Sequence, residues 1–130
     1  MLPERQVVLL ESNRRKCDFL ELAARDFPNV RVVRGRAEEQ ETDRFGVAVA
    51  KALAPPPVAL EWCLPLVAPG GAAVLLVGPT ADRDAAARVS AQLGGGEPED
   101  HGGVLVVPKL TVTPPGFPRK PGLARKRPLL

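Results

Sequence analysis

Short apolar runs alternate with longer amphipathic stretches along the chain, and this alternation predicts its regular elements. The run at residues 6–11 is continuous rather than alternating, which is typical of a strand buried on both faces of a sheet, and the run at residues 45–50 predicts another buried strand. Further apolar runs predict strands at residues 30–34, 72–77 and 104–109. Because segments of helical character separate the strands, the order predicts an α/β fold in which helices cover both faces of a sheet.

Three of the intervening segments predict helices. The first is expected to begin at Ser12 or Asn13, whose side chains can cap a helix, and to run to about residue 26. Three consecutive prolines break the chain before a second predicted helix at residues 58–66. The third predicted helix is rich in alanine and spans residues 82–93.

Proline and glycine mark two places where regular structure is expected to stop. Pro69, Gly70 and Gly71 predict a turn directly before the strand at residues 72–77. From Thr113 onward, prolines and glycines recur so closely that no regular structure is expected. The C-terminal end is therefore predicted to be an irregular segment.

The composition argues against several classes of protein. At 130 residues with 45% hydrophobic content, the chain fits a single globular domain. Aromatic residues make up only 4%, with no tyrosine, so stacking platforms for single-stranded nucleic acid are not evident. No apolar run is long enough to cross a bilayer and nothing resembles a signal peptide, so a cytoplasmic location without membrane contact is expected.

The side chains that hold zinc are scarce. Cys17 and Cys63 lie far apart and form no CxxC pair, and His101 is the single histidine. This spacing predicts no metal site. Both cysteines are expected on helices as small core residues, and Trp62, the single indole, is likewise interpreted as a core residue.

The net charge of +3 is unevenly distributed. All 15 acidic residues lie at or before Asp100 together with 12 of the 18 basic residues, so this part carries a net charge of −3. The remaining six basic residues follow without any acidic neighbour after them: Lys109, Arg119, Lys120, Arg125, Lys126 and Arg127. A basic, Pro-rich end suggests an anionic partner such as RNA, and the alternative is a solubilising disordered tail.

Glu11 stands at the carboxyl end of the first predicted strand. Folds that bind dinucleotides or S-adenosylmethionine (SAM) hold a ribose with an acid in this position, because a carboxylate accepts hydrogen bonds from two hydroxyl groups. In those folds the acid follows the second strand, and here only six residues precede Val7. The alternative interpretation is that Glu11 caps the helix that follows it.

Five segments, taken in this order, resemble the RsmG (GidB) family: VVLLESNRRKCDFL, RGRAEE, VAVAKALAPP, LPLVAPGGAAVLLVG and FPRKPGLARKRPL. The resemblance runs from about residue 7 to residue 129, and the last segment is the most distinctive. Members of this family use SAM to methylate guanine N7 of 16S ribosomal RNA in the small ribosomal subunit. The resemblance implies a partial Rossmann-like methyltransferase domain at residues 1–112 and a basic, Pro-rich C-terminal segment at residues 113–130.

The resemblance also implies cofactor-binding residues. Glu11 matches the acid that would hold the SAM ribose, and Ala37 and Glu38 match the turn that would contact the adenine edge. Lys51 falls where the family usually has arginine, near the cofactor and the reacting base. From the residues alone, Glu38 can equally belong to an ordinary charged turn, and Lys51 can be a strand-end cation that faces solvent.

The resemblance implies that Arg119 and Lys126 contact RNA phosphates. It implies no catalytic acid or base, because guanine N7 has an in-plane lone pair and carries no proton at neutral pH. N7 can attack the sulfonium methyl group directly, so catalysis would come mainly from alignment of the two reactants.

The sequence departs from the family pattern at three points. The first strand and its glycine-rich loop are not found before Val7, so we expect two strands of the sheet to lack a neighbour. Lys51 replaces arginine and cannot form the same planar bidentate fork. Val77 stands where the family commonly places lysine.

Three functions therefore remain open at the level of the sequence. The first is SAM-dependent methylation of 16S ribosomal RNA by a longer protein. The second is a catalytically inactive fragment or paralogue that binds RNA through its basic end. The third is a small nucleotide-binding α/β module with a substrate other than RNA.

Overall fold

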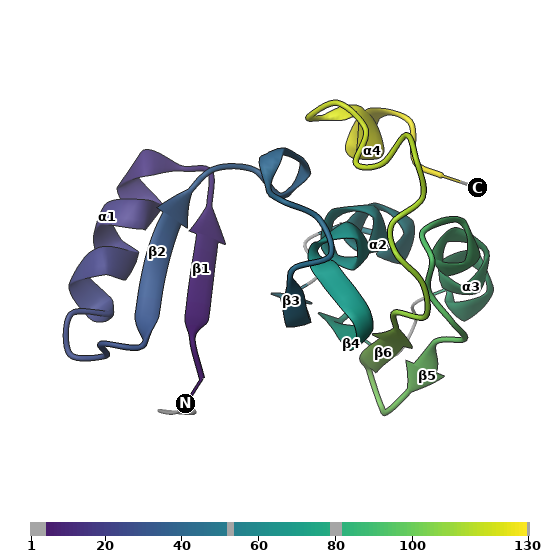
Figure 1. Cartoon of the computed structure of the whole chain (residues 1–130), viewed down its shortest axis with the longest axis horizontal. Helices are drawn as coiled ribbons and strands as arrows, with labels where there is room; N and C mark the ends of the chain where they lie inside the picture. Colours follow the sequence, from purple (N-terminus) through teal and green to yellow (C-terminus); the bar gives the residue numbers. More distant parts are fainter. Residues whose placement is uncertain (1–4, 52–53, 79–81, 130) are drawn as a thin grey trace. The chain divides into compact units, whose positions relative to one another are not determined.

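The computed structural model describes residues 5–51, 54–78 and 82–129, which form two compact units (Figure 1). One unit ends at Gln40 and the other begins at Glu41. The smaller unit contains β1 (Val7–Glu11), α1 (Arg14–Ala23), β2 (Val30–Arg34) and one turn of 3-10 helix, η1 (Ala37–Glu39). The larger unit contains β3 (Phe45–Lys51), α2 (Pro56–Cys63), η2 (Leu64–Leu66), β4 (Val67–Leu76), α3 (Arg83–Gln92), β5 (Glu99–Asp100), β6 (Val104–Pro108) and α4 (Leu123–Lys126).

The smaller unit is a βαβ motif. Its two strands pair in parallel, from Val7 opposite Val30 to Glu11 opposite Arg34. α1 connects them, and its buried residue is Cys17, as the sequence predicted for this cysteine. Parallel pairing places the carboxyl ends of β1 and β2 side by side, which is the edge where α/β proteins bind nucleotides.

The start of α1 follows the prediction and its end does not. Asn13 is the N-cap, since its Oδ1 accepts a hydrogen bond from Lys16 N at 3.1 Å. The helix ends at Ala23 rather than near residue 26. After the C-cap at Ala24 the chain leaves the helix in a turn, in which Phe27 N donates to Ala24 O at 2.9 Å.

The larger unit is built on a four-stranded sheet in the order β3-β4-β6-β5. β3 and β4 are parallel, whereas β6 is antiparallel to both of its neighbours. α2 and α3 pack together against one face, where the inward residues of β3, β4 and β6 meet them. The buried cluster comprises Ala59, Leu60, Cys63, Leu64, Ala73, Leu75, Ala86, Val89, Leu93, Leu105 and Val107.

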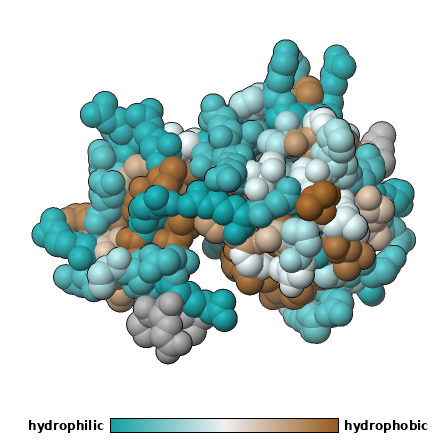
Figure 2. Space-filling model, in the orientation of Figure 1, coloured by the Kyte–Doolittle hydropathy of each residue, from teal (hydrophilic) through white to brown (hydrophobic). Residues whose placement is uncertain are grey.

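The opposite face of this sheet is apolar and open among the described residues. Ala48 and Ala50 of β3 point into the core, so the alternate residues Val47 and Val49 point away from it and are 55% and 65% exposed. Leu76 of β4 is also exposed. Figure 2 shows hydrophobic surface on the side of the larger unit that carries β3 and β4.

The turn predicted at Pro69, Gly70 and Gly71 is wrong, because β4 runs through these residues. Gly70 adopts φ +92°, a backbone conformation that glycine accepts without strain. A Cβ atom on Gly71 would overlap the carbonyl oxygen of Gly46 in β3. The two glycines therefore let two strands approach closely across the irregularity between Phe45 and Val47, instead of ending the strand.

Two further expectations need correction. The second helix begins at Pro56, because proline is tolerated in the first turn of a helix, and it continues as η2 to Leu66. The C-terminal segment contains a short helix, α4, where no regular structure was predicted. α4 fits between the prolines because Gly122 adopts φ +87° before it and Pro128 follows it.

Within the described residues, β1 pairs only with β2 and β3 pairs only with β4. Each of these strands therefore presents one edge without a neighbouring strand among these residues. The α/β class predicted from the sequence is confirmed.

Candidate functional site

Glu11 lies at the carboxyl end of β1 and is half-buried. Its Oε2 accepts a hydrogen bond from Asn13 N at 3.0 Å. This hydrogen bond lowers the pKa of the Glu11 carboxyl group, so the side chain is ionised at neutral pH. The side chain that caps α1 is that of Asn13. The Glu11 carboxylate accepts its hydrogen bond from the backbone N of this N-cap residue.

Cys17 supports the same strand end from α1. Its Sγ donates to Glu11 O at 3.1 Å, and Gly35 N donates to the same carbonyl oxygen at 3.0 Å. The Glu11 backbone is thus held both by the helix and by the residue that follows β2. These contacts fix the direction in which the Glu11 carboxylate leaves the strand.

The turn after β2 carries Ala37 and Glu38 in η1. Glu38 is only 4% exposed in its side chain, and its Oε2 lies 3.4 Å from Arg36 Nη2. Arg36 N donates to Glu39 Oε1 at 3.3 Å, which closes the turn. Since Gly35 N is bonded to the end of β1, the structure brings Glu11 and the start of this turn together at one edge of the small sheet.

Lys51 belongs to the larger unit, where it is the exposed last residue of β3 opposite Leu76 of β4. Val77, where the family commonly has lysine, is half-buried and packs against the core cluster. Its backbone N donates to Gly103 O at 2.9 Å. Val77 therefore completes the packing of the larger unit, and Lys51 is the basic residue at this strand end.

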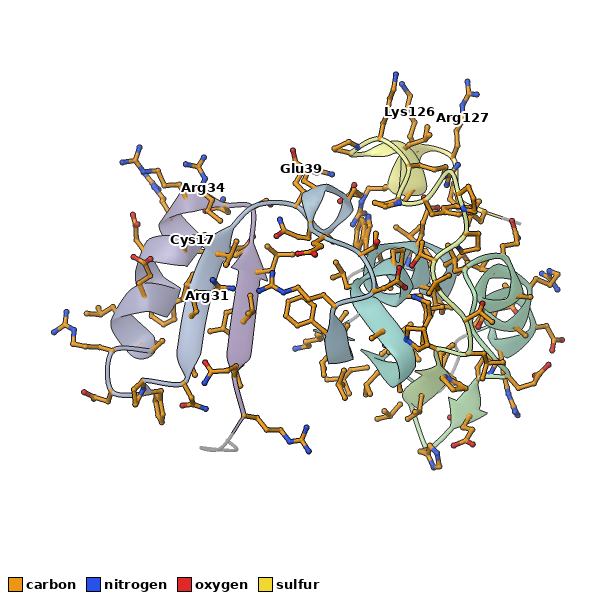
Figure 3. The ribbon with its side chains drawn as sticks, viewed as in Figure 1. Cys17, Arg31, Arg34, Glu39, Lys126 and Arg127 are labelled. Atoms are coloured by element: carbon orange, nitrogen blue, oxygen red, sulfur yellow. The ribbon has the colours of Figure 1, made fainter. Side chains whose placement is uncertain are left out.

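Arg119 and Lys126, the predicted RNA contacts, have different surroundings. Lys126 is exposed in the last turn of α4 (Figure 3). Arg119 is turned toward α2, where its Nε donates to Glu61 Oε2 at 2.7 Å and its Nη2 pairs with Glu61 Oε1. The Glu61 carboxylate raises the pKa of Arg119 further, and Glu61 itself is buried with 1% exposure.

The remaining reactive side chains do not form a second site. Burial raises the pKa of the Cys63 thiol to about 12, so this thiol is protonated at neutral pH. His101 is exposed, and its Nε2 lies 3.4 Å from Glu99 Oε2. Residues 5–51, 54–78 and 82–129 contain no group of His, Cys, Asp or Glu side chains arranged to hold a metal ion. Every helix in these ranges is too short or too polar to cross a membrane.

The comparisons with known proteins decide the family. The model of the GidB family, rRNA small subunit methyltransferase G, matches residues 1–96. The chain belongs to this family. Ribosomal RNA small subunit methyltransferase G of Rubrobacter xylanophilus is 36% identical over 152 residues, covering 99% of this chain and 58% of that protein. The corresponding protein of Salinispora arenicola is 44% identical over 124 residues, covering 85% of this chain and 51% of that protein.

This GidB chain therefore spans between half and three fifths of the length of these two relatives. Solved structures agree on the fold. The CMeT domain of a citrinin polyketide synthase superposes with a TM-score of 0.64 at 8% identity, over 84% of this chain and 40% of that one. A protein of Corynebacterium glutamicum gives a TM-score of 0.51 at 20% identity, over 85% of this chain and 63% of that one.

Sequence reasoning missed one residue of the GidB chain that bears on its candidate sites. Glu61 lies in the apolar segment PPVALEWC, and Arg119 was interpreted only as a cation for RNA. A lone acid in an apolar helix is itself a signal, because a buried carboxylate requires a partner. The sequence gives no means of choosing that partner, since Arg119 is 58 residues away.

Proposed function

We propose that this chain forms the SAM-binding edge and the RNA-facing end of a methyltransferase that modifies guanine N7 of 16S ribosomal RNA. The observation that carries the proposal is the meeting of Glu11 with the turn after β2 at the carboxyl edge of two parallel strands. Family membership supports the ribosomal RNA substrate, since the relatives are named for it.

The residues at this edge suit the adenosine part of SAM. The ionised carboxylate of Glu11 can accept hydrogen bonds from both ribose hydroxyl groups, and its backbone is held in place by Cys17 and Gly35. Ala37 offers backbone groups in the adjoining turn, and the carboxylate of Glu38 can accept a hydrogen bond from an adenine amino group. The hydrogen-bonding groups at this edge therefore match those of the adenosine part of SAM.

SAM, when bound, supplies a methyl group activated by a sulfonium centre. The protein has to hold the guanine so that the N7 lone pair points at that methyl group, and no proton has to be removed from N7. Alignment of the reacting atoms is then the main contribution of the chain. Lys51, exposed at the end of β3, is a cation that can contact a phosphate group of the substrate.

A second candidate function is RNA binding without catalysis. The observation that favours it is a change at two basic positions that the family pattern places near the reaction: Lys51 replaces arginine, and Val77 replaces lysine and packs against the core. Arginine and lysine are not equivalent where a planar fork is needed. In this second function the chain binds RNA but does not transfer a methyl group.

Transfer of labelled methyl groups distinguishes the two. The chain is incubated with methyl-labelled SAM and with small ribosomal subunits that lack the modification, and N7-methylguanine is detected by chemical strand scission of the 16S RNA. We expect label at a guanine N7 and a lower yield from Glu11→Gln. A folded chain that binds the subunits and transfers no label would support the second candidate. Label on another atom would contradict the first.

A further inference from the structure

Glu61 and Arg119 form an ion pair that connects the C-terminal segment with α2 of the larger unit. Glu61 lies in α2 and is 1% exposed, so its carboxylate needs a partner that replaces water. Arg119 supplies that partner with two nitrogens, Nε and Nη2, one on each carboxylate oxygen. This fork-to-fork arrangement is the strongest pairing open to an arginine.

The same guanidinium group also holds the chain beyond α4. Arg119 Nη2 donates to Arg127 O at 2.8 Å, so one side chain connects α2 with the residue that directly follows α4. Apolar contacts add to this link, because Ala124 of α4 is buried against Val58 of α2. The Arg125 guanidinium carbon lies 5.4 Å from the centroid of the Trp62 ring, within the range of a cation–π contact.

Cations cover the outer surface of this docked segment. Lys120, Arg125, Lys126 and Arg127 are exposed, and no acidic residue follows Asp100 in the sequence. We call these four residues the basic tip. The side chains of Lys126 and Arg127 extend away from α4 (Figure 3). The end of the molecule that carries α4 is hydrophilic in Figure 2.

We propose that Arg119 is a positioning residue, which uses Glu61 and the Arg127 carbonyl group to present the basic tip as a preformed surface for RNA phosphates. Its Nε and Nη2 donate within the protein, so the phosphate contacts fall to the basic tip. A docked segment loses less conformational entropy on binding than a free one, and this raises affinity without adding contacts. Only the identity of the partner, RNA, rests on the function proposed above.

Glu61→Gln separates this role from simple electrostatics. If Arg119 and the basic tip acted only as charges, loss of a carboxylate would leave RNA affinity unchanged or raise it, because Arg119 would become available to phosphate. If the ion pair positions the tip, the same substitution weakens RNA binding. Glu97→Gln is the matched control, since Glu97 is an exposed acid of the larger unit.

The experiment measures the affinity of the 130-residue chain for a fluorescent 16S RNA fragment by anisotropy at several potassium chloride concentrations. We expect Glu61→Gln and Arg119→Gln each to weaken binding by about five- to tenfold with an unchanged salt slope. We expect Lys126→Ala to reduce the salt slope by about one, because each phosphate contact releases about one counterion. Glu97→Gln should bind as the wild type does.

Trypsin cleavage gives a readout that is independent of RNA. The bonds after Arg125 and Lys126 should be cut faster in Glu61→Gln and in Arg119→Gln, whereas the circular dichroism spectrum stays that of the wild type. If Glu61→Gln does not fold, Arg119→Gln gives the same test at a partly exposed position.

Four results would overturn the proposal, and they differ in what else they affect. A Glu61→Gln variant that binds RNA as tightly as the wild type, or an Arg119→Gln variant whose salt slope falls by about one, would make Arg119 a phosphate contact instead. An unchanged trypsin rate in both variants would show that the ion pair does not hold the tip. A wild-type chain that binds no RNA would remove the partner, and with it the RNA part of the proposed function.

Discussion

Lys109 Nζ lies 3.0 Å from Asp43 Oδ1, although the two residues are 66 positions apart in the sequence. The Lys109 side chain is fully buried, and its ammonium group also donates to Leu64 O and Val67 O, each at 2.7 Å. Thr113 completes the group, because its N and Oγ1 each lie 3.0 Å from Asp43 Oδ1. This cluster joins the start of β3, the η2–β4 junction and the end of β6. It therefore holds together three segments of the larger unit that are distant in sequence.

Lys109→Met should therefore destabilise the larger unit strongly. The substitution keeps most of the apolar stem, but it removes the charged donor shared by the Asp43 carboxylate and the two carbonyl groups, and it leaves only Thr113 on Asp43. We expect a loss of about 3–5 kcal/mol in the free energy of unfolding, measured by urea denaturation. Lys120→Met, at an exposed position, should change stability by less than about 0.5 kcal/mol. Similar stabilities for the two variants would contradict the role given to Lys109.

Asp43 makes part of the stability dependent on pH. Burial by itself raises the pKa of Asp43, but hydrogen bonds from Lys109 and Thr113 outweigh it, so the net pKa is lowered below 3.8. A lowered carboxyl pKa stabilises the fold above the unfolded value, near 4, and this stabilisation is lost as the pH falls through the folded value. Unfolding measured between pH 6 and pH 2.5 should show a steeper loss for the wild type than for Asp43→Asn. Parallel curves would show that Asp43 does not carry this effect.

Gly71→Ala should disrupt the pairing of β3 with β4. The added methyl group would overlap the carbonyl oxygen of Gly46, and backbone cannot move aside as a flexible side chain can. We expect destabilisation of about 3 kcal/mol, at the upper end for overpacking, measured by thermal unfolding. Gly46→Ala is the control, because an added Cβ there has nothing within 4 Å. The prediction fails if Gly46→Ala is the more destabilising of the two.

Glu38→Gln should weaken cofactor binding. The substitution removes the charge of a carboxylate proposed to accept a hydrogen bond from adenine, and we expect a loss of about 1–3 kcal/mol in the binding free energy of SAM. Glu21→Gln is the control, since Glu21 is an exposed acid of α1 in the same unit. Equilibrium dialysis with labelled SAM measures both variants. Equal dissociation constants for Glu38→Gln and the wild type would refute the adenine contact.

The elements that the sequence predicted well are those determined locally. The strand at residues 30–34 was predicted with the bounds of β2, and β3 was predicted to within one residue, because a short segment rich in valine or alanine between turn residues has few other structures available. The helix at residues 82–93 was predicted equally well, since Asp82 caps it and glycines follow it. Local pattern and tertiary structure agree in these segments.

The elements that were missed depend on distant parts of the chain. The turn predicted at Gly70 and Gly71 failed because the same residues that permit a turn also permit a close approach to Gly46. α4 was missed because its contacts with α2, and not the preferences of its four residues, keep it in place. Glu61 was overlooked for the same reason, since its partner becomes visible only when residues 58 positions apart meet.

Calorimetric titration of S-adenosylhomocysteine into the purified chain measures adenosine binding at the Glu11 edge, because this compound shares the adenosine part of SAM that this edge is proposed to hold. We expect micromolar binding by the wild type and about tenfold weaker binding by Glu11→Gln, because the substitution removes a charged hydrogen-bond acceptor. A folded sample that releases no heat, or a Glu11→Gln variant that binds as tightly as the wild type, would contradict this expectation.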